Sequence, residues 1–138
     1  MVDMNAILVA RRVGEIRLSL VRECSGDISR AMSKFGLTPD ASLLVEQDRE
    51  QAIEILAALL WKDQAYGHEC MPEAAARSLA VQIISTYGDA SSRYFSNRDA
   101  STTTAQSWSA MTESTFDSGI VVASEGGKYF CVWFEDED

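Results

Sequence analysis

The segment from Tyr129 to Phe134 restricts the fold of this chain more than any other stretch, because it is apolar on both faces of a β-strand. Side chains alternate between the two faces of a strand. Tyr129, Cys131 and Trp133 therefore point one way, and Phe130, Val132 and Phe134 point the other. Both faces need cover. Four carboxylates, Glu135 to Asp138, follow directly and require water or a cationic partner.

A second strand precedes this one and forms a hairpin with it. Residues 116–124 contain Ile120, Val121 and Val122, which favour a strand. Residues 125–127, Glu-Gly-Gly, supply the glycines of a three-residue hairpin loop, and residues 128–134 then return antiparallel. A lone hairpin is marginally stable in water, so we expect this one to pack on helices.

Helical signals dominate the upstream sequence. Asp3 is a candidate N-cap for a helix reaching Arg22, with an apolar stripe at helical spacing. Asp27 is the candidate cap of a short helix that ends at Gly36. The apolar stripes of these two helices are Val9, Val13, Ile16 and Leu20, and Ile28, Ala31, Met32 and Phe35.

Further helices are predicted in the middle of the chain. Thr38-Pro39 is one start signal, and Asp48 with Gln51 is a capping-box restart, from which the longest and most apolar helix reaches Tyr66. Another helix runs from Pro72 to Gly88, and a short one is expected within 89–98. The Ser/Thr-rich residues 96–114 predict a long surface loop anchored by Trp108, a second candidate contact region.

The fold class that follows is a single α+β domain over residues 1–138. It is mainly helical, with four or five helices and a C-terminal antiparallel hairpin packed on them. No further strand is evident upstream. One face of the strand 129–134 must therefore be covered by the loop, by another strand or by another chain.

Charge narrows the classes of partner. Twelve Lys and Arg against twenty-one Asp and Glu leave a net charge of −9, which argues against a nucleic-acid partner because phosphate binding needs a basic field. Residues 1–34 carry six basic and four acidic side chains, so their net charge is +2 and the remainder holds −11. The simplest explanation is attraction between the N-terminal segment and the acidic tail within one fold.

The sequence suggests reduced thiols and a cytoplasmic location. Three cysteines without C-x-x-C spacing are a poor disulfide framework, and no signal peptide is evident. No apolar run reaches the roughly 18 residues of a membrane span. Cys24 and Cys131 lie in apolar patterns and are interpreted as small buried hydrophobes.

Catalytic and metal signatures are weak. His68-Glu69-Cys70 lacks the further ligands of a tetrahedral zinc site, and residues 68 and 70 seldom face each other in a turn, as a nucleophile and its base must. Glu50 and Glu54 lie at i, i+4 and are interpreted as a solvated acidic face. We therefore expect no catalytic residue, no metal, no cofactor and no enzymatic activity.

Two C-terminal segments carry a resemblance to known proteins. Residues 115–121, Thr-Phe-Asp-Ser-Gly-Ile-Val, and residues 131–138, Cys-Val-Trp-Phe-Glu-Asp-Glu-Asp, resemble small acidic bacterial immunity proteins that neutralise secreted toxins, with weaker similarity at residues 60–63. The resemblance implies a cytoplasmic inhibitor that binds its toxin and occludes the active site. It implies no chemistry of the inhibitor's own.

The resulting hypothesis is a protein that binds a basic toxin domain such as a nuclease, steered by opposite charge. It expects neither a nucleic-acid nor a membrane partner, and leaves the oligomeric state open, a homodimer included. Aromatic and acidic side chains are the candidate contacts. They are Trp133, Phe134, Glu135, Asp136, Glu137, Asp138, Trp61, Asp63 and Tyr66.

Two alternatives stay open. The first is an adaptor or chaperone that holds an apolar segment of another, secreted protein against its helices. The second is a small enzyme whose site gathers His68 with Asp63, Glu69 or Cys70.

Overall fold

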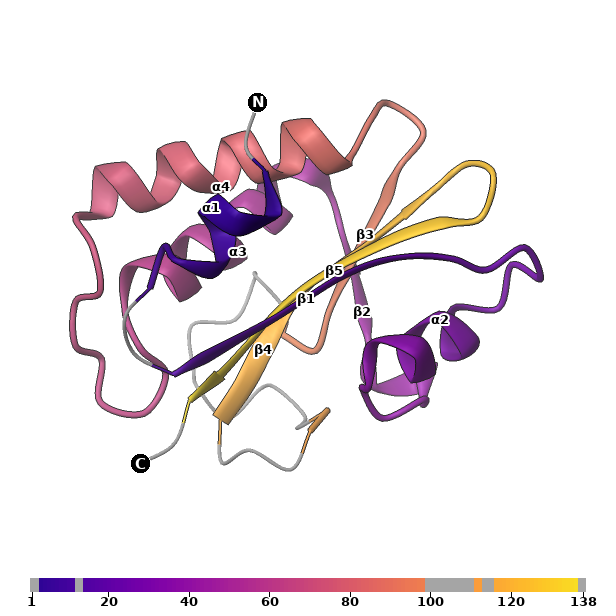
Figure 1. Ribbon diagram of the computed structural model, residues 1–138, viewed down its shortest axis with the longest axis horizontal. Coiled ribbons are helices and arrows are strands. Elements are labelled where there is room, and N and C mark those ends of the chain that lie inside the picture. The colour runs from indigo at the N-terminus through magenta and orange to yellow at the C-terminus, as the bar shows by residue number, and fades with distance from the viewer. Residues whose placement is uncertain (1–2, 12–13, 99–110, 113–115, 137–138) are drawn as a thin grey trace.

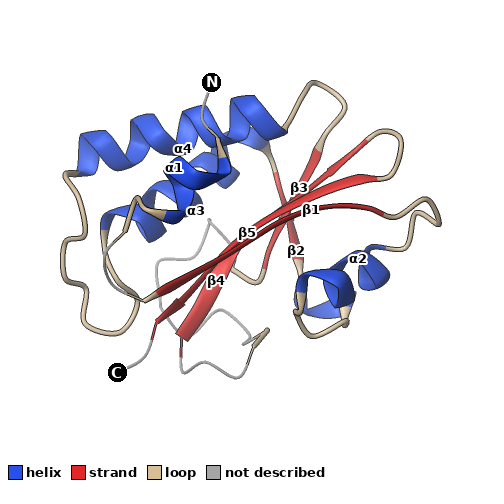
Figure 2. Cartoon of the chain, viewed as in Figure 1, coloured by secondary structure: helices blue, strands red, loops and turns tan. Residues whose placement is uncertain are grey.

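A computed structural model describes residues 3–11, 14–98, 111–112 and 116–136. Five strands form one antiparallel sheet in the order β1-β5-β4-β3-β2. Helices α1, α3 and α4 lie on one side of this sheet and α2 on the other (Figures 1 and 2). The elements are α1 (Met4–Leu8), β1 (Glu15–Arg22), α2 (Ile28–Phe35), a 3-10 turn (Ala41–Leu43), β2 (Val45–Gln47), α3 (Arg49–Trp61), α4 (Glu73–Tyr87), β3 (Arg93–Ser96), β4 (Phe116–Ser124) and β5 (Lys128–Asp136).

Strand β5 occupies the interior of the sheet, between β1 and β4, and both of its faces are buried. Phe130, Val132 and Phe134 join the core beneath α3 and α4. Tyr129, Cys131 and Trp133 join a second core beneath α2. The predicted alternation is therefore confirmed, and the face that lacked a partner in the sequence is covered by this chain's own α2 layer.

The predicted fold class, a mainly helical domain with a C-terminal hairpin, is wrong because the sheet has five strands. The largest error is the expected helix from Asp3 to Arg22. Only α1 is helical there, Gly14 then adopts φ +69, and β1 follows. Ile16, Leu18 and Leu20 alternate with polar positions at the period of a strand, and this signal competes with the helical stripe.

Strand β1 is thus the partner strand that the sequence analysis did not find. It pairs with β5 along its whole length, from Glu15 opposite Glu135 to Arg22 opposite Lys128. The paired residues lie more than a hundred positions apart in the sequence, so no local sequence pattern predicts this pairing. The first strand of the chain therefore forms one edge of the sheet, beside the last strand.

The short helix expected within 89–98 is also wrong. Residues Arg93–Ser96 form β3, which sends Tyr94 into the α3/α4 core and Phe95 toward the α2 core. A short apolar run does not by itself distinguish helix from strand. Pairing with β4 on one side and β2 on the other decides the outcome.

Several local predictions are confirmed. Asp3 and Asp27 cap α1 and α2, and Gly36 ends α2 in the left-handed conformation. Asp48 and Gln51 form the capping box of α3, and α4 runs between Pro72 and Gly88. Helix α3 ends at Trp61, however, and not at Tyr66. The hairpin of β4 and β5 is also present.

The region predicted as a loop, 96–114, lies largely outside the described residues, including Trp108. Its described ends converge on Asp117, a buried carboxylate of β4 that the sequence analysis did not single out. Asn97 donates a hydrogen bond to Asp117, and so do the backbone amides of Met111 and Thr112. Asp117 therefore joins both described ends of this region, and Thr38 adds two hydrogen bonds to the Met111 carbonyl.

Candidate functional site

The turn between α3 and α4 is organised around Asp63, whose side chain is 9% exposed. The backbone amides of Tyr66 and His68 donate to its two carboxylate oxygens at 2.6 and 2.8 Å. The Asp63 amide in turn donates to the His68 carbonyl at 3.0 Å, and the Cys70 amide donates to the Trp61 carbonyl at 2.6 Å. Residues 62–70 consequently form a braced turn.

This turn presents an aromatic pair to solvent. The rings of Tyr66 and His68 stack with centroids 5.6 Å apart, and 63% of Tyr66 is exposed. Because Asp63 holds the backbone at both positions, the pair is presented without the ordering cost that a free loop would carry. The arrangement suits contact with another protein, for which an exposed Tyr is a frequent anchor.

Hydrogen bonding to the backbone lowers the pKa of Asp63. Burial raises the pKa of Asp63. The amides of Tyr66 and His68 and the nearby His68 ring together lower it by more, so the pKa lies below its ordinary value of 3.8. The carboxylate is therefore ionised at neutral pH and accepts both amide hydrogen bonds.

We predict that the turn loosens in acid. A depressed folded-state pKa means that the stabilisation by Asp63 is complete at neutral pH and is lost as the pH falls through that pKa, below 3.8. Hydrogen exchange should show protection of the Tyr66 and His68 amides decreasing there, relative to amides of β5. Asp63→Ala should expose both amides already at neutral pH, and unchanged protection in that variant would contradict the assignment.

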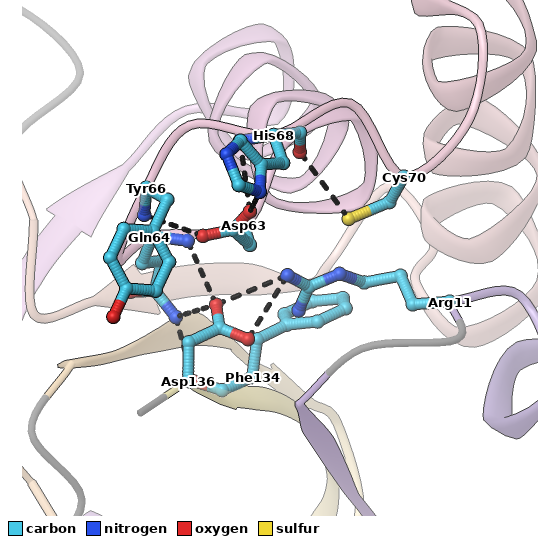
Figure 3. Close-up of polar contacts among 8 residues, drawn as sticks. All are labelled: Arg11, Asp63, Gln64, Tyr66, His68, Cys70, Phe134 and Asp136. Carbon is cyan, nitrogen blue, oxygen red and sulfur yellow. Dashed lines mark hydrogen bonds and ion pairs between the residues drawn. The ribbon is translucent and has the colours of Figure 1, made fainter. Parts of the chain in front are cut away.

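The end of β5 is attached to the same turn through Asp136 (Figure 3). The backbone amide and the Nε2 of Gln64 both donate to Asp136 Oδ2 at 3.0 Å, and Nη2 of Arg11 donates to both carboxylate oxygens at 3.1 Å. The side chains of Arg11 and Asp136 are 0% and 3% exposed. The guanidinium also lies 5.1 Å from the centroid of the Phe134 ring. Gln64 therefore anchors the turn to the end of β5, and Arg11 neutralises the carboxylate that accepts its hydrogen bonds.

Glu135 has its own cationic partner. Nη2 of Arg17 lies 3.3 Å from Glu135 Oε1, and Nη1 of Arg17 donates to the Phe35 carbonyl at the end of α2. A cation at a helix C-terminus also complements the helix dipole. The predicted attraction between the N-terminal segment and the acidic tail is confirmed for Glu135 and Asp136.

The structure separates the predicted contact residues into groups. Trp133 and Phe134 are fully buried, and Glu135 and Asp136 are buried and paired, so none of the four offers much surface to a partner. Glu137 and Asp138 lie outside the described residues. Asp63 is buried, Trp61 is half-buried and Tyr66 is exposed. Their role in binding stays a prediction, and Tyr66 is best placed for it.

The structure brings the Trp61–Tyr66 segment and the tail together, although they are distant in sequence. Gln64 makes that connection by bonding to Asp136, whose charge Arg11 balances, and the sequence analysis singled out neither Gln64 nor Arg11. The basic excess of residues 1–34 was the available signal for Arg11. For Gln64 no signal was available, because its role depends on where the turn meets β5.

The residues near His68 do not form a nucleophile pair in this geometry. The Cys70 thiol is directed at the His68 carbonyl oxygen, 3.7 Å away, and not at the imidazole (Figure 3). Nδ1 of His68 lies 4.0 Å from Asp63, and the imidazole is mostly exposed. Within the described residues no three His, Cys, Asp or Glu side chains are grouped as a metal site would require.

The cysteines differ in environment. Burial strongly raises the pKa of the Cys131 thiol, which agrees with the prediction of a small buried hydrophobe. Cys24 is exposed, so the same prediction is wrong for that residue. It follows β1 in a turn and does not lie on a helical stripe, because the predicted helix is absent.

Comparisons with known proteins give no relative: no protein family, no curated protein and no solved structure matches this chain. None of the helices in the described part of the chain is both long and apolar enough to cross a membrane.

Proposed function

We propose that this protein is an immunity-type inhibitor that binds a basic toxin domain, such as a nuclease, in the bacterial cytoplasm and occludes its active site. The observation that carries the proposal is the exposed Tyr66–His68 pair on a turn braced by Asp63, in a protein of net charge −9. The resemblance of residues 115–121 and 131–138 to immunity proteins supports the same role.

The buried pairs change which residues are proposed as contacts. Glu135 and Asp136 are neutralised by Arg17 and Arg11, so neither is offered to a partner, and Asp136 also accepts the hydrogen bonds of Gln64 that hold the turn. The proposed contact surface is instead the outer side of residues 61–69, where Tyr66 supplies apolar area. Acidic groups elsewhere on the surface accelerate association with a basic partner through long-range attraction.

The test uses a nuclease toxin domain encoded by a gene adjacent to the one for this protein. We expect the purified protein to inhibit that nuclease stoichiometrically. Tyr66→Ala should weaken binding by about 2 kcal/mol, roughly 30-fold, as for a contact hot spot. The exposed apolar residue Val45 of β2 is a matched control, and Val45→Ala should leave affinity unchanged.

The outcomes separate the functional classes. Binding of an unrelated secreted or transported protein, with nuclease activity left intact, would favour the adaptor or chaperone. Turnover of a substrate that His68→Ala abolishes, with binding retained, would favour the small enzyme. Equal inhibition by wild type and Tyr66→Ala would remove the turn from the mechanism and leave the class of function standing.

A further inference from the structure

The groove between α3 and α4 is lined by acidic and aromatic side chains that could hold a group presented by a partner. Its volume is about 400 Å³, and it lies beside the turn that presents Tyr66. The side chains of Ala57, Ala58 and Ala74 line it and are small, which leaves the space open. The remaining lining residues are Trp61, Glu54, Glu73 and Arg77.

The side chains that line the groove carry more negative than positive charge. Arg77 is already engaged by Glu50, with Nη2 of the arginine 2.5 Å from Oε1 of the glutamate. Glu54 and Glu73 line the groove from α3 and α4, and neither has an ion-pair partner within the described part of the chain. Two carboxylates thus line a shared space in which the lining guanidinium, that of Arg77, is already paired with Glu50.

The indole of Trp61 completes a cation-binding set. Nζ of Lys62 lies 4.1 Å from the centroid of the Trp61 ring, so this ring already receives an ammonium group from its own chain. Indole is the strongest cation–π acceptor among the side chains. Lys62 is exposed, and an incoming cation can displace it or take another part of the ring.

We propose that this groove receives an arginine side chain of a basic protein partner, with its guanidinium stacked on Trp61 and hydrogen-bonded to Glu54 and Glu73. Arginine fits better than lysine because its planar group stacks on an aromatic ring while donating to carboxylates in its plane. This inference rests on the proposed function, because it names the group by which a basic toxin would be held.

The probe is a blocked hexa-arginine peptide, titrated against the full chain and followed by the Trp61 indole N–H signal in NMR spectra. We expect the signal to shift on binding. Glu54→Gln/Glu73→Gln should weaken binding about fivefold or more, beyond the loss caused by Glu15→Gln/Glu125→Gln, two exposed acids away from the groove. A hexa-lysine peptide should bind more weakly.

Lys62 provides a second variant that removes no groove ligand. Lys62→Met frees the indole from its internal cation and should tighten peptide binding about threefold. Lys128→Met makes the same charge change in the β4–β5 hairpin and is the matched control, since Lys128 is also exposed. Equal effects of the two lysine substitutions would show general attraction to an acidic surface and would overturn the groove assignment.

Equal weakening by the two glutamate pairs would overturn it too. The peptide experiment does not use the toxin, so its failure is distinguishable from failure of the proposed function. If Glu54→Gln/Glu73→Gln inhibits the nuclease as strongly as the wild type does, the immunity role stands and the groove is not the contact site. If the protein binds the peptide in the groove but inhibits no nuclease, the groove assignment stands and the immunity role is contradicted.

Discussion

Arg11→Met is expected to lower the free energy of unfolding by about 3–5 kcal/mol, because it leaves the buried carboxylate of Asp136 without its counter-ion. Gln64 still donates two hydrogen bonds to that carboxylate, but neither carries a charge. Urea unfolding followed by circular dichroism measures the change. The exposed pair of Arg93 and Glu46 is the matched control, and Arg93→Met should cost less than about 1 kcal/mol.

A double variant tests whether the loss of stability comes from the unpaired charge of Asp136. Nε and Nη1 of Arg11 are buried and have no hydrogen-bond partner within the described residues, so the native pair retains part of its desolvation cost. Arg11→Met/Asp136→Asn should therefore recover much of the stability that Arg11→Met loses. If the two single losses simply add in the double variant, the ion pair is not the source of the effect.

Asp117→Ala is expected to destabilise the protein by roughly 3–5 kcal/mol, since it leaves several buried donors without an acceptor at once. The groups that donate to Asp117 are Asn97 Nδ2, the Met111 and Thr112 amides, Thr112 Oγ1 and Trp133 Nε1. These donors, all from the described residues, are neutral. Chemical unfolding measures the loss.

Asp117→Asn gives a more specific test of the same network. The shape of the side chain is kept, but one oxygen becomes a donor that faces the donors of Thr112 or Met111. We expect a loss of stability close to that of Asp117→Ala. Glu125→Gln, an exposed acid-to-amide change in the hairpin loop, should have almost no effect. A stable Asp117→Asn would show that the charge at this position contributes little.

Local capping rules predicted both ends of α2 and α4 and the start of α3. Asp27 and Gly36 enclose α2, and Asp48 with Gln51 begins α3, because a cap acts through hydrogen bonds to amides two or three residues away. The glycine turn at residues 126–127 likewise sets the β4–β5 hairpin. Such features depend on sequence neighbours and can be recognised before any tertiary contact is known.

The candidate site was only partly predictable. Tyr66 and Asp63 were identified as residues of interest, but their opposite roles, one exposed and one buried as a brace, follow from the early end of α3 at Trp61. The acids at 135 and 136 were predicted as contacts because a run of carboxylates at a chain end resembles a solvated surface. Arg11 and Arg17 approach them only when β1 pairs with β5.

The sequence alone determined that residues 129–134 form a strand needing cover on both faces, since alternation and apolar character are local properties. It also determined the excess of negative charge and the capped helices. Only the tertiary structure decided what provides the cover: α3 and α4 on one face and α2 on the other, with β1 and β4 at the edges of the strand. Strand pairing over a long sequence separation depends on all the layers packing together, and the buried partners of Glu135 and Asp136 follow from that pairing.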